Sequence, residues 1–266
     1  LDASWRALVE HHDYPPVIRD TLGEAAAATV LLASTLKFEG LLTLQMQGPG
    51  PMHLLVSQAT HRMAIRAVAR FRGEPPASGG LQALAGREGQ VTVTIENEDR
   101  SSRYQGVVPL VGDGLAPCLQ HYFERSEQLP TRLWLAATPE RAAGLLLQRL
   151  PTGASSSAEE DEMQAAEGDE DWNRVLHLAA TLTPEELVKL PGSELLRRLF
   201  HEEDVRMFDP GPVYFQCTCS RERVTGILRS LGEREVSSVL AEQGQVEVRC
   251  EFCNRAYRYD AVDVAG

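Results

Sequence analysis

The residues best suited to chemistry are four cysteines near the C-terminal end of the 266-residue chain. They form two close pairs, Cys217-x-Cys219 and Cys250-x-x-Cys253, whereas the fifth cysteine, Cys118, stands alone. Zinc prefers tetrahedral coordination, and four thiolates at about 2.3 Å satisfy it. The spacing therefore predicts one zinc ion per chain, held by Cys217, Cys219, Cys250 and Cys253.

The 30 residues between the two pairs would fold the pairs together. A unit of about 50 residues has little core of its own, so a metal would act as its staple. Nearby cations favour thiolate over thiol, and five arginines lie close in sequence: Arg221, Arg223, Arg249, Arg255 and Arg258. Spacing alone leaves two hypotheses open. The ion is an inert structural clip, or the sulfurs form a redox switch that releases zinc on pairing as disulfides.

Other candidate residues are weaker. Cys118, which follows Pro117 and precedes an apolar stretch, is typical of a buried small hydrophobe rather than a nucleophile. Adjacent His11 and His12 would form a poor metal pair, and residues 48–51 (GPGP) lack the Lys-Ser/Thr of a phosphate-binding loop. No catalytic motif is present, so we do not expect an enzyme.

Composition narrows the function classes. The net charge of −12 argues against non-specific binding to nucleic acid or anionic membranes. No run approaches about 18 consecutive apolar residues, so no membrane span is expected. Residues 22–36 are interrupted by Glu24 and follow no basic segment, which argues against a signal peptide. Paired cysteines at one end of a Cys-poor chain favour a reducing compartment, so we predict a cytoplasmic protein.

The elements that must position the cysteines divide into three parts. The pattern of residues 1–154 predicts an α+β core domain. This mixed unit of helices and strands is large enough to have its own hydrophobic core. Its expected helices cover 18–37, 114–127 and 139–149. Its expected strands cover 40–47, 52–58, 63–71, 91–95, 104–110 and 132–137.

Residues 155–210 predict a helical linker that begins with a strongly acidic run. Residues 159–171 hold eight of the 38 acidic residues and no basic residue, so the run repels itself and marks a domain boundary. Short helices follow. Thr183 opens one with a capping box and Ser193 is the expected N-cap of another. Such short helices need a neighbouring surface. We expect their apolar face to cover a patch on the core domain: Trp172, Leu176, Leu187, Leu196 and Phe200.

Residues 211–266 predict a small metal-binding module. Ser220 would cap a helix that stops at Gly232, and a second short helix would cover 233–242. A strand at 245–249 would pair in a hairpin with the segment that contains Tyr257 and Tyr259. Both cysteine pairs flank this unit.

At its C-terminal end the sequence resembles a known family. Residues 195–223 (LLRRLFHEEDVRMFDPGPVYFQCTCSRER), followed by residues 249–253 (RCEFC), closely resemble heat shock protein 33, the redox-regulated holdase chaperones. Residues 121–131 (HYFERSEQLPT) are similar to the family's central segment, and residues 59–66, ahead of Gly79-Gly80, are similar too. The resemblance covers nearly the whole chain.

The resemblance implies an ATP-independent chaperone that is monomeric, zinc-bound and inactive when reduced. The family's zinc ligands map onto Cys217, Cys219, Cys250 and Cys253, and Cys118 matches none. It implies that oxidation pairs Cys217 with Cys219 and Cys250 with Cys253 and releases zinc. The linker then loosens, since the helices at 172–205 lose their neighbour, and dimers capture unfolding client proteins.

Two rival functions come from other classes. A zinc-stabilised binding adaptor would hold one defined partner and ignore oxidants. A thiol-disulfide oxidoreductase would need its C-x-x-C at the start of a helix in a βαβ unit, whereas Cys250 and Cys253 follow a predicted strand.

Overall fold

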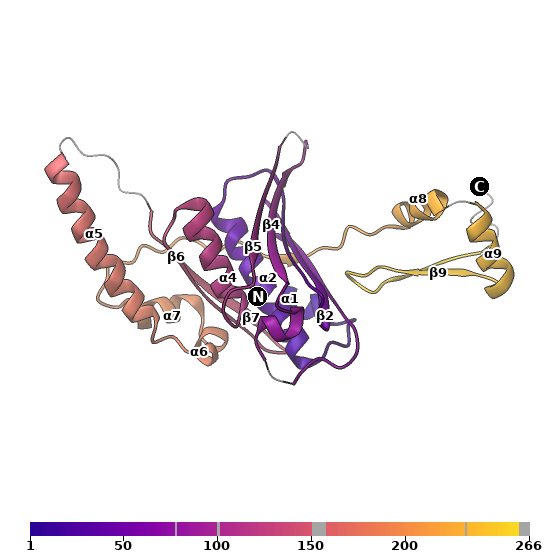
Figure 1. Ribbon diagram of the computed structural model, residues 1–266, viewed down its shortest axis with the longest axis horizontal. Helices are drawn as coiled ribbons and strands as arrows, with labels where there is room; N and C mark the ends of the chain where they lie inside the picture. The colour runs from indigo at the N-terminus through magenta and orange to yellow at the C-terminus, as the bar shows by residue number, and fades with distance from the viewer. Residues whose placement is uncertain (78, 100–101, 151–157, 232, 261–266) are drawn as a thin grey trace.

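A six-stranded sheet forms the body of the protein in the computed structural model (Figure 1). The structure describes residues 1–77, 79–99, 102–150, 158–231 and 233–260. The strand order is β5-β4-β1-β2-β3-β8, antiparallel except for β8, which runs parallel to β3. The strands are β1 (Gly40–Gln47), β2 (Met52–Thr60), β3 (Ala64–Phe71), β4 (Gln90–Asn97), β5 (Arg103–Pro109) and β8 (Tyr214–Phe215).

The sheet buries one face against helix α2 (Pro16–Thr35). In β1, Leu42, Leu44 and Met46 are buried and alternate with half-buried Leu41 and Thr43, as the two-residue period of a strand requires. The predicted turn at residues 48–51 joins β1 to β2. There Gly48 lies so close to the 81–85 helix that a Cβ would meet the Ala85 carbonyl oxygen at 2.0 Å.

A second layer lies on the far side of α2. Strands β6 (Thr131–Ala137) and β7 (Ala142–Gln148) form an antiparallel hairpin that packs on α2, so the helix is sandwiched between two sheets. Three short helices complete the core: α1 (Ala3–Val9), α3 (Leu81–Ala85) and α4 (Leu115–Tyr122), the last extended by a π-helical turn, Phe123–Glu127.

The predicted helix at 139–149 is wrong, because this segment is strand β7. Its Ala and Leu residues favour a helix locally, but pairing along the whole of β6 and packing on α2 override that propensity. Thr138 and Arg141 close the hairpin turn, and the Thr138 amide donates to the Arg141 carbonyl at 2.8 Å. The other predicted elements of the core are present within a few residues of their expected ends.

The linker is helical, and its acidic run is part of a helix. Helix α5 (Ala158–Ala179) begins earlier than the apolar spacing predicted; α6 (Pro184–Lys189) and α7 (Gly192–Leu199) follow. The predicted capping box of α6 is confirmed between Thr183 and Glu186. The prediction for α7 was wrong, because Pro191 and not Ser193 is the N-cap, and the Leu195 amide bonds to the Pro191 carbonyl at 2.9 Å.

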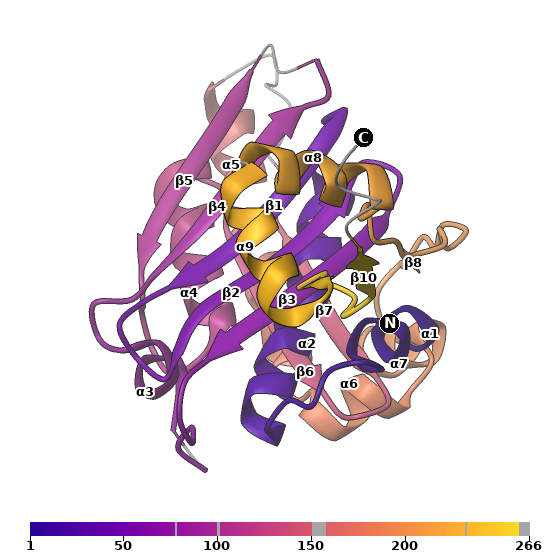
Figure 2. The same cartoon turned by 90° about the vertical axis from the view of Figure 1, so that its right-hand side faces the viewer.

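The linker helices pack on the β6–β7 hairpin and not on the C-terminal module (Figures 1 and 2). The expectation that zinc loss removes their neighbour therefore needs correction, since that neighbour is the core domain. Of the predicted face, Leu187 and Phe200 are buried and Leu196 is partly buried. Trp172 and Leu176 are half-buried, and α5 contributes other residues to this contact. We call the apolar contact the linker cluster; its buried members are Ala136, Ala179, Leu182, Leu187, Val188, Leu195, Leu199 and Phe200.

The C-terminal module matches its predicted elements. Helices α8 (Arg221–Leu231) and α9 (Glu233–Gln243) precede the hairpin of β9 (Val246–Arg249) and β10 (Ala256–Tyr259). Ser220 Oγ accepts from the Arg223 amide at 3.2 Å, so it caps α8 as expected, whereas Gly232 lies outside the described residues. The module has a small core of its own: Val224, Leu228, Val236, Val246, Tyr257 and Tyr259. Within the described parts of the chain, no helix has both the length and the apolar character to cross a membrane.

Candidate metal centre

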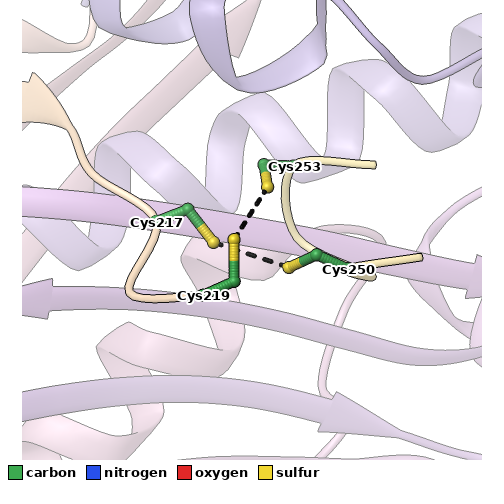
Figure 3. Close-up of side chains that lie close together, drawn as sticks. All are labelled: Cys217, Cys219, Cys250 and Cys253. Carbon is green, nitrogen blue, oxygen red and sulfur yellow. Dashed lines mark hydrogen bonds between the residues drawn. The ribbon is translucent and has the colours of Figure 1, made fainter. Parts of the chain in front are cut away.

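The four cysteines predicted as ligands converge on one point between β8 and the β9–β10 hairpin (Figure 3). Their Sγ atoms all lie within 4.8 Å of one another. Two short separations join residues of different pairs. Cys217 Sγ lies 3.5 Å from Cys250 Sγ, and Cys219 Sγ lies 3.4 Å from Cys253 Sγ.

This arrangement fits a tetrahedral metal ion. Four thiolates at about 2.3 Å from a central zinc lie about 3.8 Å apart, and the observed cluster needs only small shifts to reach that geometry. Sulfur ligands at tetrahedral corners favour zinc or an iron–sulfur cluster over oxygen-preferring ions. Because every sulfur is close to every other, the geometry does not select a disulfide pairing, and the pairing that the resemblance implies stays a prediction.

Local backbone structure brings each pair to the cluster. Cys217 and Cys219 continue the alternation of β8, so both face the same side of an extended segment. After β9 the chain turns back on itself: the Cys250 amide donates to the Arg255 carbonyl at 2.9 Å, and the Asn254 amide to the Cys250 carbonyl at 2.7 Å. Asn254 adopts φ of +54°, a left-handed conformation that asparagine tolerates and the tight turn requires. We call residues 250–254 the knuckle.

Hydrogen bonding makes the four thiols unequal. Burial opposes ionisation of Cys219, but bonds from Tyr257 and from the neighbouring cysteines outweigh it and lower the pKa of this thiol to about 7. The Tyr257 hydroxyl lies 3.1 Å from Cys219 Sγ. Burial raises the pKa of Cys217 and of Cys253. A bound cation would favour the thiolate form of all four.

Of the five arginines singled out from sequence, Arg255 interacts electrostatically with Cys219 and Cys253. Arg249 and Arg258 pair instead with Glu247. Arg221 lies over the ring of Tyr259, 4.4 Å from its centroid, and Arg223 donates to the Thr218 carbonyl at 2.9 Å. Closeness to the cysteines in sequence therefore did not reveal these other partners of Arg221, Arg223, Arg249 and Arg258.

The knuckle also contacts the core domain, which the sequence analysis missed. The Arg66 guanidinium lies over the Phe252 ring at 4.2 Å and donates to Thr218 Oγ1 at 2.7 Å. Arg70 forms an ion pair with Glu251. Arg66 and Arg70 stand four residues apart on β3 and so share one face of the sheet. The sequence did hold a signal for this contact: two basic residues four positions apart on an otherwise apolar strand.

The N-terminal loop contributes a second contact to the knuckle. Asn254 Nδ2 donates to the His11 carbonyl at 2.7 Å. His12 Nε2 lies 3.2 Å from the Phe252 carbonyl oxygen, and its ring stacks on Tyr14. The two histidines thus hold the knuckle rather than forming a metal pair of their own.

Cys118 lies far from the cluster, in α4. It is fully buried and in contact with the Val111 and Gly114 backbone, and burial raises the pKa of its thiol. These features agree with the prediction of a small buried hydrophobe.

The fold and the site together define a class: an α+β domain that carries a docked helical linker and a separate module with four clustered thiols. The family model described as "Hsp33 protein" matches residues 1–260. A 33 kDa chaperonin of Nitrosococcus oceani is 49% identical over 264 residues, which cover 99% of this chain and 86% of that protein. A 33 kDa chaperonin of Methylobacillus flagellatus is 44% identical, with the same two shares covered.

A solved structure shares the fold. The crystal structure of the 33 kDa chaperonin (heat shock protein 33 homolog) of Thermotoga maritima superimposes with a TM-score of 0.77 at 20% identity, covering 100% of this chain and 90% of that one. The chain therefore belongs to the Hsp33 family.

Proposed function

We propose that this protein is a redox-regulated, ATP-independent chaperone of the cytoplasm that holds unfolding client proteins and has no enzymatic activity. The family membership and the names of the relatives support the chaperone class. The observation that carries the regulation is the cluster of four thiols, which lies where the C-terminal module meets the core domain. In this proposal, residues 1–154 form the core, residues 155–210 the linker and residues 211–266 the redox module.

In the reduced state, Cys217, Cys219, Cys250 and Cys253 would hold one zinc ion. The ion would supply cross-linking energy that the module's small core lacks. Tyr257 would orient Cys219 through its hydrogen bond, and Arg255 would offset part of the negative charge of four thiolates.

Oxidation would change the cluster two electrons at a time. Two thiolates give two electrons to one peroxide molecule, which leaves as two hydroxide ions, and one disulfide forms. Two such steps convert the cluster into two disulfides, for which we propose Cys217–Cys219 and Cys250–Cys253. Disulfide sulfurs carry no negative charge, so no thiolate remains to hold a divalent cation.

Loss of the cluster would then reach the linker indirectly. The knuckle loses its shape and with it the contacts to Arg66 and Arg70. Residues 201–213 join α7 to β8 without regular structure, so release of β8 frees one end of the linker. The linker cluster would open, apolar surface would be exposed, and two chains would associate around clients.

One experiment tests the proposal. A chemically unfolded client is diluted into buffer with reduced or with peroxide-treated protein, and light scattering is followed together with zinc release to a coloured chelator. We expect suppression of aggregation only after oxidation, with one zinc released per chain. A Cys118→Ser variant should behave identically. Suppression that is equal in both states, or absent from both, would reject the switch, and an oxidant-insensitive adaptor would give the second result.

A further inference from the structure

Residues 213–216 occupy the edge of strand β3 as a short parallel strand. The Tyr214 amide donates to the Met63 carbonyl at 3.1 Å, and the Gln216 amide donates to the Ile65 carbonyl at 3.0 Å. The register places Tyr214 opposite Ala64 and Phe215 opposite Ile65. The Phe215 amide therefore points away from β3.

Side chains of this segment alternate between the core and the solvent. Val213 and Phe215 are half-buried and pack against the main core, whereas Tyr214 is 42% exposed. Helix α1 forms the opposite wall, since it contacts β8, and Ala7 lines a cavity of about 550 Å³ together with Phe215 and Cys217. The edge of β3 and α1 thus make a groove for an extended chain with apolar side chains at every second position.

The segment is held in this groove by few interactions of its own. The Tyr214 and Gln216 amides bond to β3, Val213 and Phe215 supply apolar side chains, and the next residue is the candidate metal ligand Cys217. The cluster anchors the C-terminal end of β8, and the knuckle contacts hold the module against β3. A strand this short is marginal once its anchor is lost.

We propose that the β3 edge is a binding site for extended apolar segments of unfolded polypeptides, occupied in cis by residues 213–216 while the cysteine cluster is intact. The inference rests on the proposed redox function. An unfolded client offers unpaired backbone groups, which a strand edge binds whatever the sequence. The cis occupant shows what the groove accepts: backbone donors spaced two residues apart and an apolar side chain between them.

A capped, fluorescein-labelled peptide with the sequence of residues 211–216 (GPVYFQ) tests the site by anisotropy with the full-length chain. We expect binding to the peroxide-treated protein and at least about tenfold weaker binding to the reduced, zinc-loaded protein, in which the groove is filled. N-methylation of the nitrogen equivalent to that of Gln216 removes one bond to β3 and should weaken binding about tenfold. N-methylation at the position of Phe215 is the matched control and should leave binding unchanged.

A variant of the chain tests the cis occupant directly. Phe215→Ser keeps all four cysteines and removes the apolar anchor of β8, so the reduced variant should bind the peptide while retaining one zinc per chain. Equal effects of the two N-methyl groups would show non-specific apolar binding and overturn the site. So would a lack of peptide binding by oxidised protein that suppresses client aggregation, and that result would leave the proposed function intact. Failure of the oxidised protein to suppress aggregation would instead reject the proposed function. Peptide binding to the Phe215→Ser variant would still show whether the groove at the β3 edge binds extended chains.

Discussion

The linker helices and the C-terminal module are both docked on the core domain, but by different physical means. The linker buries Leu187, Leu195, Leu199 and other apolar side chains against the β6–β7 hairpin. Beyond β8, the module contacts β3 and the N-terminal loop through a cation over a ring, an ion pair and single hydrogen bonds. The two regions lie on opposite sides of the core (Figures 1 and 2).

In the proposed function, this difference would assign oxidant sensing to the module and exposure of apolar surface to the linker. Polar contacts at a half-exposed interface contribute about 0.5–1.5 kcal/mol each, whereas a buried leucine contributes about 2–5 kcal/mol on truncation. We therefore expect a local change to undock the module more readily than the linker, whose contact with the core is formed by buried apolar side chains. Because the two parts share no surface in the described residues, coupling must pass along residues 201–216 or through the core.

The largest expected effect comes from the cysteine cluster. Cys250→Ser replaces one thiolate by a poor ligand, so zinc affinity should fall by several orders of magnitude, since structural zinc sites contribute about 10–16 kcal/mol. We expect the module to unfold, β8 to be released and the linker cluster to open, while the core domain remains folded. Zinc stoichiometry and hydrogen exchange of β9 and β10 measure this. Cys118→Ser is the matched control. Full zinc retention by Cys250→Ser would contradict the proposed zinc site.

The second prediction concerns the linker. Leu199 is 3% exposed in the linker cluster, and Leu199→Ala should destabilise docking by about 2–5 kcal/mol. The reduced, zinc-loaded variant should then suppress client aggregation and show fast amide exchange across α6 and α7. Exposed Arg197→Ala in the same helix is the control. If the linker amides of Leu199→Ala exchanged freely yet clients still aggregated, linker release would not control activity. The linker would then not be the part whose undocking exposes the client-binding surface.

Leu199 also shows where sequence reasoning succeeded and where it stopped. Helical spacing and the capping box at Thr183 predicted the short helices and their need for a surface. They did not reveal that the surface is the β6–β7 hairpin, since residues 139–149 favour a helix locally and become a strand only by pairing with β6. A contact between distant segments is a tertiary fact that no local pattern contains.

The cysteine cluster was the more predictable region. Cysteines have few alternative roles at such spacing, so Cys217, Cys219, Cys250 and Cys253 could be assigned to one cluster directly. Its surroundings could not. Arg66 contacts Phe252 across 186 positions of sequence, and only the fold brings them together. In contrast, Arg249 and Arg258, which lie close to the cysteines in sequence, form ion pairs with Glu247.

The third prediction alters the core beneath both docked parts. Glu24 lies on α2, which contacts both the β6–β7 hairpin and β3. Burial, with added repulsion from Asp20, raises the pKa of Glu24 to about 7. The folded state therefore binds this proton more tightly than the unfolded state. Its contribution to stability is complete below about pH 4.5 and is lost as pH rises through 7, a change of about 3 kcal/mol at most.

Glu24→Gln should remove that loss. Above pH 7 the variant should unfold at higher denaturant concentration than the wild type, and below about pH 4.5 the two should differ little. Because the change lies in the core, exchange in the linker and in the module should respond alike. A shift confined to one docked part would show that α2 supports that part alone, and an unchanged pH profile would contradict the buried, raised-pKa carboxyl.

The smallest expected effect tests the polar side of the comparison. Arg66→Gln removes both the cation over Phe252 and the bond to Thr218 Oγ1, for a loss of about 1–2 kcal/mol. The cysteine cluster is untouched, so one zinc per chain should remain bound. Undocked molecules should nevertheless become more frequent, seen as faster proteolysis within residues 201–216 and faster exchange of the Tyr214 and Gln216 amides. Exposed Arg72→Gln, just beyond the same strand, is the matched control.

Peroxide should release zinc faster from Arg66→Gln, because undocking exposes the sulfurs that line the cavity beside α1. Wild-type rates of both proteolysis and zinc release would mean that the knuckle contacts do not hold the module, and that the anchor of β8 lies in the cluster alone.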